Sequence, residues 1–225
     1  MQVVKHAIIS AAGIGSRLGL NMPKCLVKVN GRRIIDYQLE LLSEIEDVRV
    51  VVGFLEDQVI DHVRQVREDV IFVRNSNYAS TSTLQSIALA ARFMKEPFLA
   101  LDGDVIIEKR SFKRFLHSCK QGAPLIGVTA AGTEDAVFVR SKKVNGQIIV
   151  EGFQRNPNTD LEWTGIAYLD GGHIRNENRF VYELLEQSLP LPAAMLECFE
   201  VDTQADLAKA NNCVSQDLKI GQFSL

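Results

Sequence analysis

The chain has 225 residues, and its composition (46% hydrophobic, 24% charged) is that of a folded globular protein rather than a disordered one. The formal net charge of −3 argues against a nucleic-acid-binding protein and leaves any anionic ligand to a few local Lys and Arg residues. The apolar runs fall far short of the ~20 residues that span a bilayer, so no membrane partner is expected.

The N-terminus and the cysteines favour a cytoplasmic protein. Lys5 and His6 precede a short apolar stretch, without the long hydrophobic segment and small-residue cleavage site of a signal peptide. The four cysteines are widely scattered and form no CxxC pair: Cys25, Cys119, Cys198 and Cys213. This pattern favours reduced thiols over a disulfide framework or a zinc site.

The first half of the chain alternates strand and helix patterns. Short runs of β-branched and apolar residues predict strands at 6–10, 48–52, 70–73 and 97–101. Apolar residues at helical spacing predict helices at 34–45, 58–66 and 84–94. This rhythm predicts an α/β fold with a Rossmann-like, mostly parallel sheet, right-handed crossovers and helices on both faces.

The second half has a different pattern, with short strands expected at 125–129, 137–140 and 162–169. Asn145-Gly146 is a strong hairpin turn signal between two apolar runs. Helices are expected at 179–187 and 205–211, the latter with Asp202 or Thr203 as its N-cap. Because no linker or repeat divides the chain, we predict a single domain over 1–225 with a small antiparallel insertion.

A glycine-rich loop follows the first strand and reads AAGIGSRLG over 11–19. Such a turn lets backbone N–H groups approach phosphates. A dinucleotide-binding fingerprint is disfavoured, because its third glycine comes one position late and no acidic residue ends the second strand. Arg17 and, within MPKCL, Lys24 add two cations, which suits a triphosphate. A tight turn with surface charges is the alternative.

Two acidic segments lie next to predicted elements: one follows a strand, and the other precedes the last helix. Asp102 and Asp104 lie at the carboxyl end of a strand, the edge where α/β sheets bind ligands. Glu200 and Asp202 are two residues apart, so in an extended segment they face the same side. Carboxylates are the hard oxygen ligands that Mg²⁺ prefers, although an Asp-Gly turn and a helix cap are simpler explanations.

The segment AAGIGSRLG followed by MPKCLVKVNGRRIIDYQLELL resembles the signature of GT-A-type nucleotidyltransferases. This family includes sugar-1-phosphate nucleotidylyltransferases and cytidylyltransferases for phosphocholine, inositol phosphate and aminoethylphosphonate. Its pattern is L-A-A-G-x-G-x-R and then P-K-x-L, with Ser10 here in place of the usual Leu. The resemblance implies a GT-A-like fold, triphosphate contact by Arg17, α-phosphate contact by Lys24, and nucleotide contacts from Ala11, Ala12, Gly13, Gly15 and Ser16.

The resemblance extends to the acidic segments. The family has G-D where this chain has Gly103-Asp104, which implies that Asp104 is a Mg²⁺ ligand. Its closing E-I-D-x-x-x-D-L element is similar to the segment that begins at Glu200, which implies that Glu200 and Asp202 complete the metal site. Asp102 is expected to orient the metal ligand or to contact the ribose.

A polar loop reads NSNYASTSTLQS from Asn75 to Ser86, more hydroxyl and amide groups than helix capping needs. It is similar to the N-x-x-Y-x-x-T-N-N-x-x-S pattern of the cytidylyltransferase branch, with Ser and Thr in place of the paired Asn. The likeness implies nucleotide contacts from Tyr78, Thr81, Ser82, Thr83 and Ser86. Thr164-Gly165 resembles the family's acceptor-side segment, where only one of Glu162 and Trp163 can face the site.

The sequence therefore predicts a Mg²⁺-dependent enzyme that joins an NTP, with CTP favoured, to a small phosphorylated alcohol or phosphonate and releases pyrophosphate. Three alternatives stay open: a sugar-1-phosphate uridylyl-, guanylyl- or thymidylyltransferase, nucleotide transfer to a molybdopterin-type cofactor, and a non-catalytic nucleotide-binding domain. The oligomeric state is open, a homodimer being one option.

Overall fold

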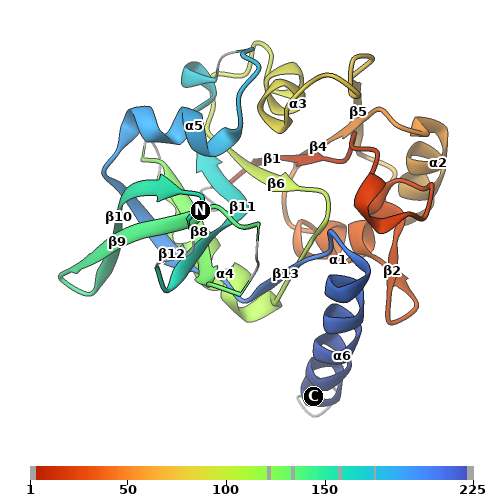
Figure 1. Cartoon of the computed structure of the whole chain (residues 1–225). Helices are drawn as coiled ribbons and strands as arrows, with labels where there is room; N and C mark the ends of the chain where they lie inside the picture. The colour runs from red at the N-terminus through yellow and green to blue at the C-terminus, as the bar shows by residue number, and fades with distance from the viewer. Residues whose placement is uncertain (1–3, 121–122, 133–134, 157–158, 175, 222–225) are drawn as a thin grey trace.

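The computed structural model describes residues 4–120, 123–132, 135–156, 159–174 and 176–221. Its centre is a nine-stranded sheet in the order β5-β4-β1-β6-β11-β8-β12-β10-β9. Two short antiparallel pairs lie outside this sheet: β2 with β3 (Lys28–Val29, Arg32–Arg33) and β7 with β13 (Val105–Ile107, Cys198–Glu200). The α/β fold class expected from the sequence is confirmed (Figure 1).

One half of the sheet is parallel. β1 pairs with both β4 and β6, and β4 also pairs with β5. β1, β4 and β6 are largely buried on both sheet faces, which explains their mostly apolar sequences. The edge strand β5 is more exposed. In this register Ser10 at the end of β1 lies opposite Asp102 at the end of β6, so the loops that follow the two strands are adjacent. The four strands are His6–Ser10, Asp47–Val52, Phe98–Asp102 and Ile71–Arg74.

The other half of the sheet is mainly antiparallel and is continuous with the parallel half. β11 pairs antiparallel with both β6 and β8, and β12 joins β8 in parallel. The predicted hairpin is confirmed: β9 and β10 are joined by Asn145 (φ 51°) and Gly146 (φ 81°), the positive φ pair of a tight hairpin turn. The strands are Leu125–Ala130 (β8), Phe138–Val144 (β9), Gln147–Gln154 (β10), Leu161–Leu169 (β11) and Leu191–Met195 (β12).

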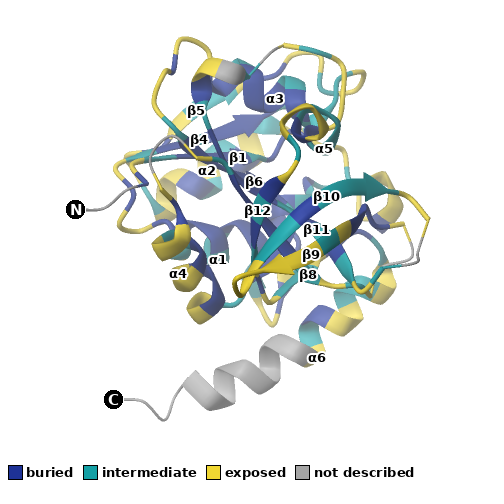
Figure 2. Cartoon of the chain, turned by 90° about the vertical axis from the view of Figure 1, so that its left-hand side faces the viewer, coloured by how far each residue is buried: buried dark blue, intermediate teal, exposed yellow. Residues whose placement is uncertain are grey.

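Helices cover both faces of the sheet, as predicted (Figure 2). One apolar cluster joins Leu39, Val63 and Phe115 from α1, α2 and α4 to one face. A second joins Ile87 and Leu185 from α3 and α5 to the other face. These helices are Ile34–Leu41 (α1), Glu56–Val66 (α2), Thr83–Ala90 (α3), Lys109–Ser118 (α4) and Val181–Leu185 (α5).

The C-terminal helix α6, Gln204–Gly221, is longer than the predicted 205–211 and projects from the body of the domain (Figure 1). Asn30 beside β2 holds it through two hydrogen bonds to Asn211, at 2.7 and 3.0 Å. No helix among the described residues combines the length and apolarity that a membrane span requires. Cys25, Cys119 and Cys198 are unpaired thiols, and the side chain of Cys213 lies outside the described residues.

Gly103 allows the loops after β1 and β6 to approach each other. Its N–H donates to the carbonyl of Ser10 at 2.9 Å. A Cβ at this position would lie 2.6 Å from that same oxygen, closer than real side chains come. At Gly13, in the neighbouring loop, a Cβ would have no atom within 4 Å.

We expect Gly103→Ala to lower the free energy of unfolding by about 1–3 kcal/mol, the usual cost of forcing extra atoms into a packed site. The matched variant Gly13→Ala should stay within about 0.5 kcal/mol of the wild type. Urea denaturation of the three proteins measures both effects. Equal stability of the two variants would contradict the close approach of β1 and β6.

Candidate active site

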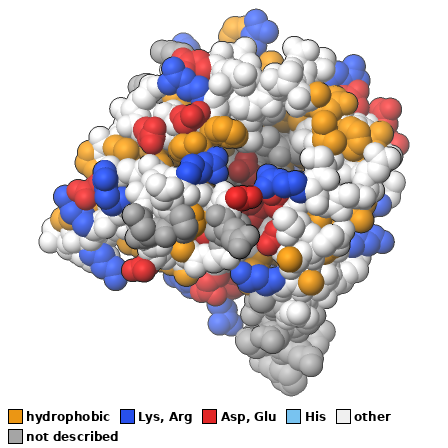
Figure 3. Space-filling view, in the orientation of Figure 1, with side chains coloured by type: hydrophobic (Ala, Val, Ile, Leu, Met, Phe, Trp, Pro, Cys, Tyr) orange, Lys and Arg blue, Asp and Glu red, His pale blue; other side chains and the backbone are white. Residues whose placement is uncertain are grey.

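A cleft of about 640 Å³ opens at the carboxyl ends of β1 and β6. Its walls come from the glycine-rich loop, the end of β6, the middle of β11, the start of α5 and the segment that joins β13 to α6. Acidic side chains gather in the hollow at the centre of this face, with basic side chains at its rim (Figure 3). Open α/β sheets bind ligands at this edge.

The glycine-rich loop forms the floor beside β1. Gly15 has a φ of 66°, a left-handed conformation that suits glycine, and a Cβ there would lie 2.6 Å from Cγ of Lys24. The Lys24 side chain therefore runs directly over the loop. Ala12 is the exception among the predicted contacts, because it is buried in the core while the others line the cleft: Ala11, Gly13, Gly15, Ser16 and Arg17.

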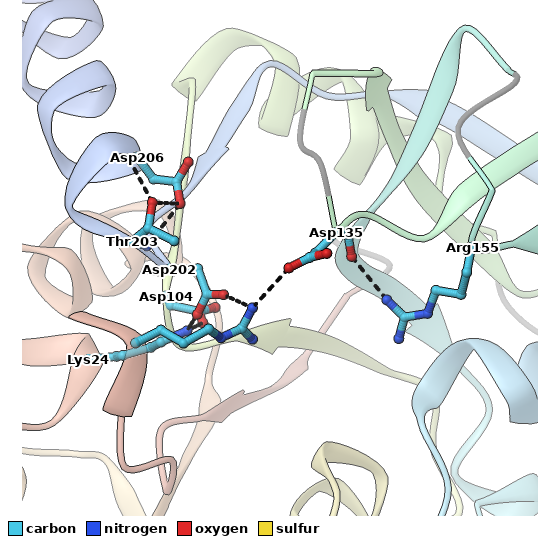
Figure 4. A network of polar contacts seen from close by, with 8 residues as sticks. Lys24, Asp104, Asp135, Arg155, Asp202, Thr203 and Asp206 are labelled. Atoms are coloured by element: carbon cyan, nitrogen blue, oxygen red, sulfur yellow. Dashed lines mark hydrogen bonds and ion pairs between the residues drawn. The ribbon is translucent and has the colours of Figure 1, made fainter. Parts of the chain in front are cut away.

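A network of charges lies at the centre of the cleft (Figure 4). The Nζ of Lys24 donates to Asp104 at 2.8 Å and also to Asp202. Arg17 forms an ion pair with Asp202 and lies 3.8 Å from Asp135. Although burial alone would lower the pKa of Lys24, its contacts with Asp104 and Asp202 raise it, so this ammonium stays charged. The fold thus brings together residues that the sequence predicts from three distant motifs.

Asp202 does not cap α6. Thr203 precedes the helix, its Oγ1 accepts from the N–H of Asp206 at 3.2 Å, and its own N–H donates to the Asp206 carboxylate at 2.9 Å (Figure 4). This reciprocal arrangement satisfies the start of the helix. The Asp202 carboxylate is therefore left to Lys24 and Arg17, and the simpler explanation of Asp202 as a helix cap is wrong.

Three carboxylates converge in the cleft: oxygens of Asp104, Glu200 and Asp202 all lie within 4.8 Å of one another. The pairing of β13 with β7 places Glu200 opposite Val105, and the N–H of Val201 donates to the Asp104 carbonyl at 3.0 Å. Desolvation by the cleft walls, together with Asp104, raises the pKa of Glu200 to about 7. Hard oxygen ligands in so small a space are a donor set that fits a divalent cation.

Asp102 lies against the backbone of β11. A Cβ at Gly165, whose φ is 73°, would lie 2.4 Å from Oδ2 of Asp102, so this glycine makes room for the carboxylate. Desolvation raises the pKa of Asp102 well above its usual range, and Asp104 and Glu200 add to the shift. Asp102 lines the cleft, separate from the convergent carboxylates.

The middle of β11 supplies another wall. Trp163 lines the cleft, whereas Glu162 is absent from its lining and accepts a hydrogen bond from the N–H of Gly132 at 2.9 Å. Thr164 also lines the cleft, but its hydroxyl donates to the carbonyl of Gly127 at 2.9 Å. Its side chain therefore ties β11 to β8.

The polar loop before α3 is organised by Asn75, which is buried. Its Nδ2 donates to the hydroxyls of Thr81 and Ser86 at 2.8 and 3.0 Å. Ser82 caps α3. Among the predicted hydroxyl contacts of this loop, Thr83 is the one that lines the cleft in the described part of the chain. The structure thus assigns Thr81, Ser82 and Ser86 to shaping the loop rather than to the cleft wall.

Tyr78 also shapes the loop. A Cβ at Gly53 would lie 2.7 Å from Cβ of Tyr78, so the tyrosine lies directly on the backbone after β4. Its ring also packs against Phe54, with centroids 6.2 Å apart. Tyr78 therefore joins the polar loop to the parallel half of the sheet and is absent from the cleft lining.

Sequence reasoning missed Gln38, a fully buried residue of α1. Its Nε2 donates to the carbonyls of Asp102 and Val105, at 2.7 and 2.9 Å. These two bonds hold both ends of the turn that carries Asp104. The only sign of Gln38 in the sequence is a polar residue on the apolar side of a predicted helix.

We expect Gln38→Met to lower the free energy of unfolding by about 2–4 kcal/mol, because two buried carbonyls lose their donor. Displacement of Asp104 should also lower kcat about tenfold. Urea denaturation and steady-state kinetics measure the two effects. Gln65→Met, on the exposed face of α2, is the control. Wild-type stability in Gln38→Met would show that the turn between β6 and β7 does not depend on the hydrogen bonds from Gln38.

Several known proteins are similar to this chain in sequence or in fold. The chain is 36% identical over 115 residues to the choline-phosphate cytidylyltransferase of Streptococcus pneumoniae, covering 49% of each protein. It is 28% identical over 205 residues to the CTP:phosphoglutamine cytidylyltransferase of Campylobacter jejuni, covering 82% of this chain and 80% of the relative. The inositol-1-phosphate CTP transferase from T. maritima shares the fold, with a TM-score of 0.76 at 19% identity over 95% of this chain and 96% of the other.

Some matches span only part of the relative. The aligned region covers about half of the Streptococcus protein, and 45% of a bifunctional protein GlmU from Methanococcus vannielii. A family model described as the MobA-like NTP transferase domain matches residues 7–156, which include the glycine-rich loop and Asp104. The match covers two of the three segments that meet in the cleft. The chain belongs to the MobA-like NTP transferase family and is a nucleotidyltransferase.

Proposed function

We propose that this nucleotidyltransferase transfers the CMP group of CTP to a small phosphorylated alcohol or phosphonate and releases pyrophosphate. The observation that carries the proposal is the meeting, in one cleft, of the glycine-rich loop, Lys24 and three convergent carboxylates. A loop that suits phosphates beside a cluster that fits a divalent cation is what nucleotide transfer requires.

Each group has a distinct place in the reaction. Arg17 and the loop amides hold the β- and γ-phosphates, and Lys24 lies at the α-phosphate. An ionised oxygen of the acceptor's phosphate attacks the α-phosphorus in line. The bond between that phosphorus and the α,β-bridging oxygen breaks, and pyrophosphate leaves with the electron pair. No protein nucleophile is needed, because the attacking oxygen is already an anion.

Asp104, Glu200 and Asp202 would hold Mg²⁺, which supplies positive charge to the phosphate oxygens when bound. Lys24 then exchanges its carboxylate partners for the phosphate. Because the interaction of Lys24 with the α-phosphate strengthens as charge develops there, this lysine contributes to the transition state more than to nucleotide binding.

Two observations support CTP as the nucleotide. The polar loop from Asn75 to Ser86 is similar to that of cytidylyltransferases, and two relatives are named as cytidylyltransferases. Thr83 and Ala11 line the cleft where that loop meets β1. Cytosine presents an amino donor where uracil presents an acceptor, so a pocket made for one base leaves a polar group unpaired with the other.

Calorimetric titration of CTP, UTP, GTP and ATP with Mg²⁺ tests the base. We expect CTP to bind about ten- to a hundredfold more tightly than UTP, the cost of one unpaired buried group. Tighter binding of UTP or GTP would overturn the choice of base and leave the reaction class standing. Pyrophosphate release, screened with four nucleotides against phospho-alcohols, phosphonates and sugar phosphates, tests the reaction itself.

A further inference from the structure

We infer that Arg155 is a specificity-determining residue, and that it selects a phosphorylated acceptor that also carries a carboxylate. This inference rests on the proposed function, which places the acceptor's phosphate beside the α-phosphate that Lys24 contacts. The part of the cleft away from the glycine-rich loop is lined by Arg155, Trp163, Phe180 and Tyr182, and this is the space left for the remainder of the acceptor.

The aromatic side chains in this part of the cleft form a connected group. The rings of Phe180 and Tyr182 are stacked, with centroids 5.8 Å apart and planes 12° apart. Phe153, behind them, lies 6.0 Å from Tyr182 and 6.3 Å from Trp163. Aromatic faces alone would suit a cationic acceptor group such as a quaternary ammonium.

The guanidinium of Arg155 already lies over these rings. Its central carbon is 5.6 Å from the centroid of Phe180 and 5.2 Å from that of Tyr182. Its Nη1 donates to the backbone carbonyl of Asp135 at 3.0 Å, so the side chain is held from two directions (Figure 4). A second cation at these rings would be repelled by the first.

A guanidinium has five N–H donors in a fixed plane and pairs with a carboxylate through two of them. The Asp135 carboxylate lies 3.8 Å from Arg17, on the other side of the network, and Arg155 contacts the Asp135 backbone. Arg155 lines the cleft, and no carboxylate among the described residues forms an ion pair with it. An acceptor whose phosphate lies beside the α-phosphate at Lys24, and whose carboxylate lies at Arg155, would match this arrangement.

Matched acceptors test this inference. O-phosphoserine is phosphoethanolamine with a carboxylate added, and 3-phosphoglycerate is glycerol 3-phosphate with a carboxylate in place of an alcohol. We expect the carboxylate member of at least one pair to have an approximately tenfold higher kcat/KM for CMP transfer, and phosphocholine to be poor. Arg155→Gln should abolish that preference, the loss expected for one charge-assisted contact at an accessible site.

Arg140→Gln is the control, because Arg140 also donates to a backbone carbonyl, that of Glu151, outside the cleft. It should keep the wild-type preference. Calorimetry of the same acceptors, with Mg²⁺ and a non-hydrolysable CTP analogue, separates the two proposals. Carboxylate-dependent binding that needs Arg155 without any product would sink the proposed reaction and leave the inference standing. A preference for phosphocholine, or an unchanged preference in Arg155→Gln, would overturn the inference.

Discussion

Replacing Asp104 by Asn is expected to lower kcat at least ~100-fold with little effect on folding. The substitution keeps the shape of the side chain and removes one of three carboxylate charges that lie within 4.8 Å of one another. It also weakens the partner that holds Lys24 at 2.8 Å. Pyrophosphate release from CTP and an acceptor that the wild type uses measures the change, and Mn²⁺ titration followed by electron paramagnetic resonance reports the metal site without turnover.

Asp61→Asn, on the exposed face of α2, removes the same charge away from the cleft and should be silent in both assays. Two results would contradict the metal assignment. One is wild-type turnover by Asp104→Asn, and the other is full activity of the unaltered protein in excess chelator. Loss of turnover with unchanged Mn²⁺ binding would move Asp104 from the metal to the orientation of Lys24.

Replacing Lys24 by Met is expected to lower kcat by about 100-fold or more, with a smaller rise in the KM for CTP. The aliphatic part of the side chain is kept, so its packing over Gly15 survives, whereas the charge beside the α-phosphate is lost. Arg17→Ala should show the opposite balance, a larger effect on the KM for CTP than on kcat. Steady-state kinetics with CTP varied at saturating acceptor separates the two parameters.

The effect of Mg²⁺ on the melting temperature distinguishes the loss of the Lys24 charge from a general disturbance of the structure. Without Lys24 the carboxylates of Asp104 and Asp202 lose a shared counter-charge, so Mg²⁺ should raise the melting temperature of Lys24→Met more than that of the wild type. Lys28→Met, on an exposed position of β2, is the control. If Lys24→Met were kinetically silent, the loop would be a structural turn with surface charges.

Much of the sheet could be predicted, because the inner parallel strands β1, β4 and β6 are largely buried on both faces and so consist mostly of apolar residues. The strands and the helix that were not predicted depend on tertiary contacts. β12 reads LPAAM, with little β-branched character, and becomes a strand because β8 and β10 lie on either side. β7 and β13 are three residues each and exist as a pair. α4 has few apolar residues on its buried side, among them Phe112 and Phe115.

The ends of the helices were less accurate. The helix predicted to reach residue 45 ends at Leu41, and the helix predicted to reach residue 94 ends at Ala90. In both cases apolar residues beyond the helix, Ile45 and Met94, are still buried, so hydrophobic spacing continues after the hydrogen-bonded turns stop. Burial and helical structure are therefore distinct signals at these positions.

Most of the charged centre of the site was predictable because its residues lie within short motifs, with Asp135 as the exception. The polar loop was harder, because its hydroxyl groups are equivalent in the sequence and the buried Asn75 decides which of them turn inward. Gln38 and Arg155 belong to no motif. Their places depend on the packing of α1 against the β6–β7 turn and of β10 against α5, which local sequence does not encode.

The ion pairs of Lys24 with Asp104 and Asp202 bear on the order in which substrates assemble. In the free protein Lys24 serves as an internal counter-ion, so a bare divalent cation would share the same oxygens with an ammonium group. When a phosphate binds, Lys24 can exchange its carboxylate partners for the phosphate, so its ammonium group keeps an anionic partner. We therefore expect metal and nucleotide to enter as one complex, rather than the metal to bind alone first.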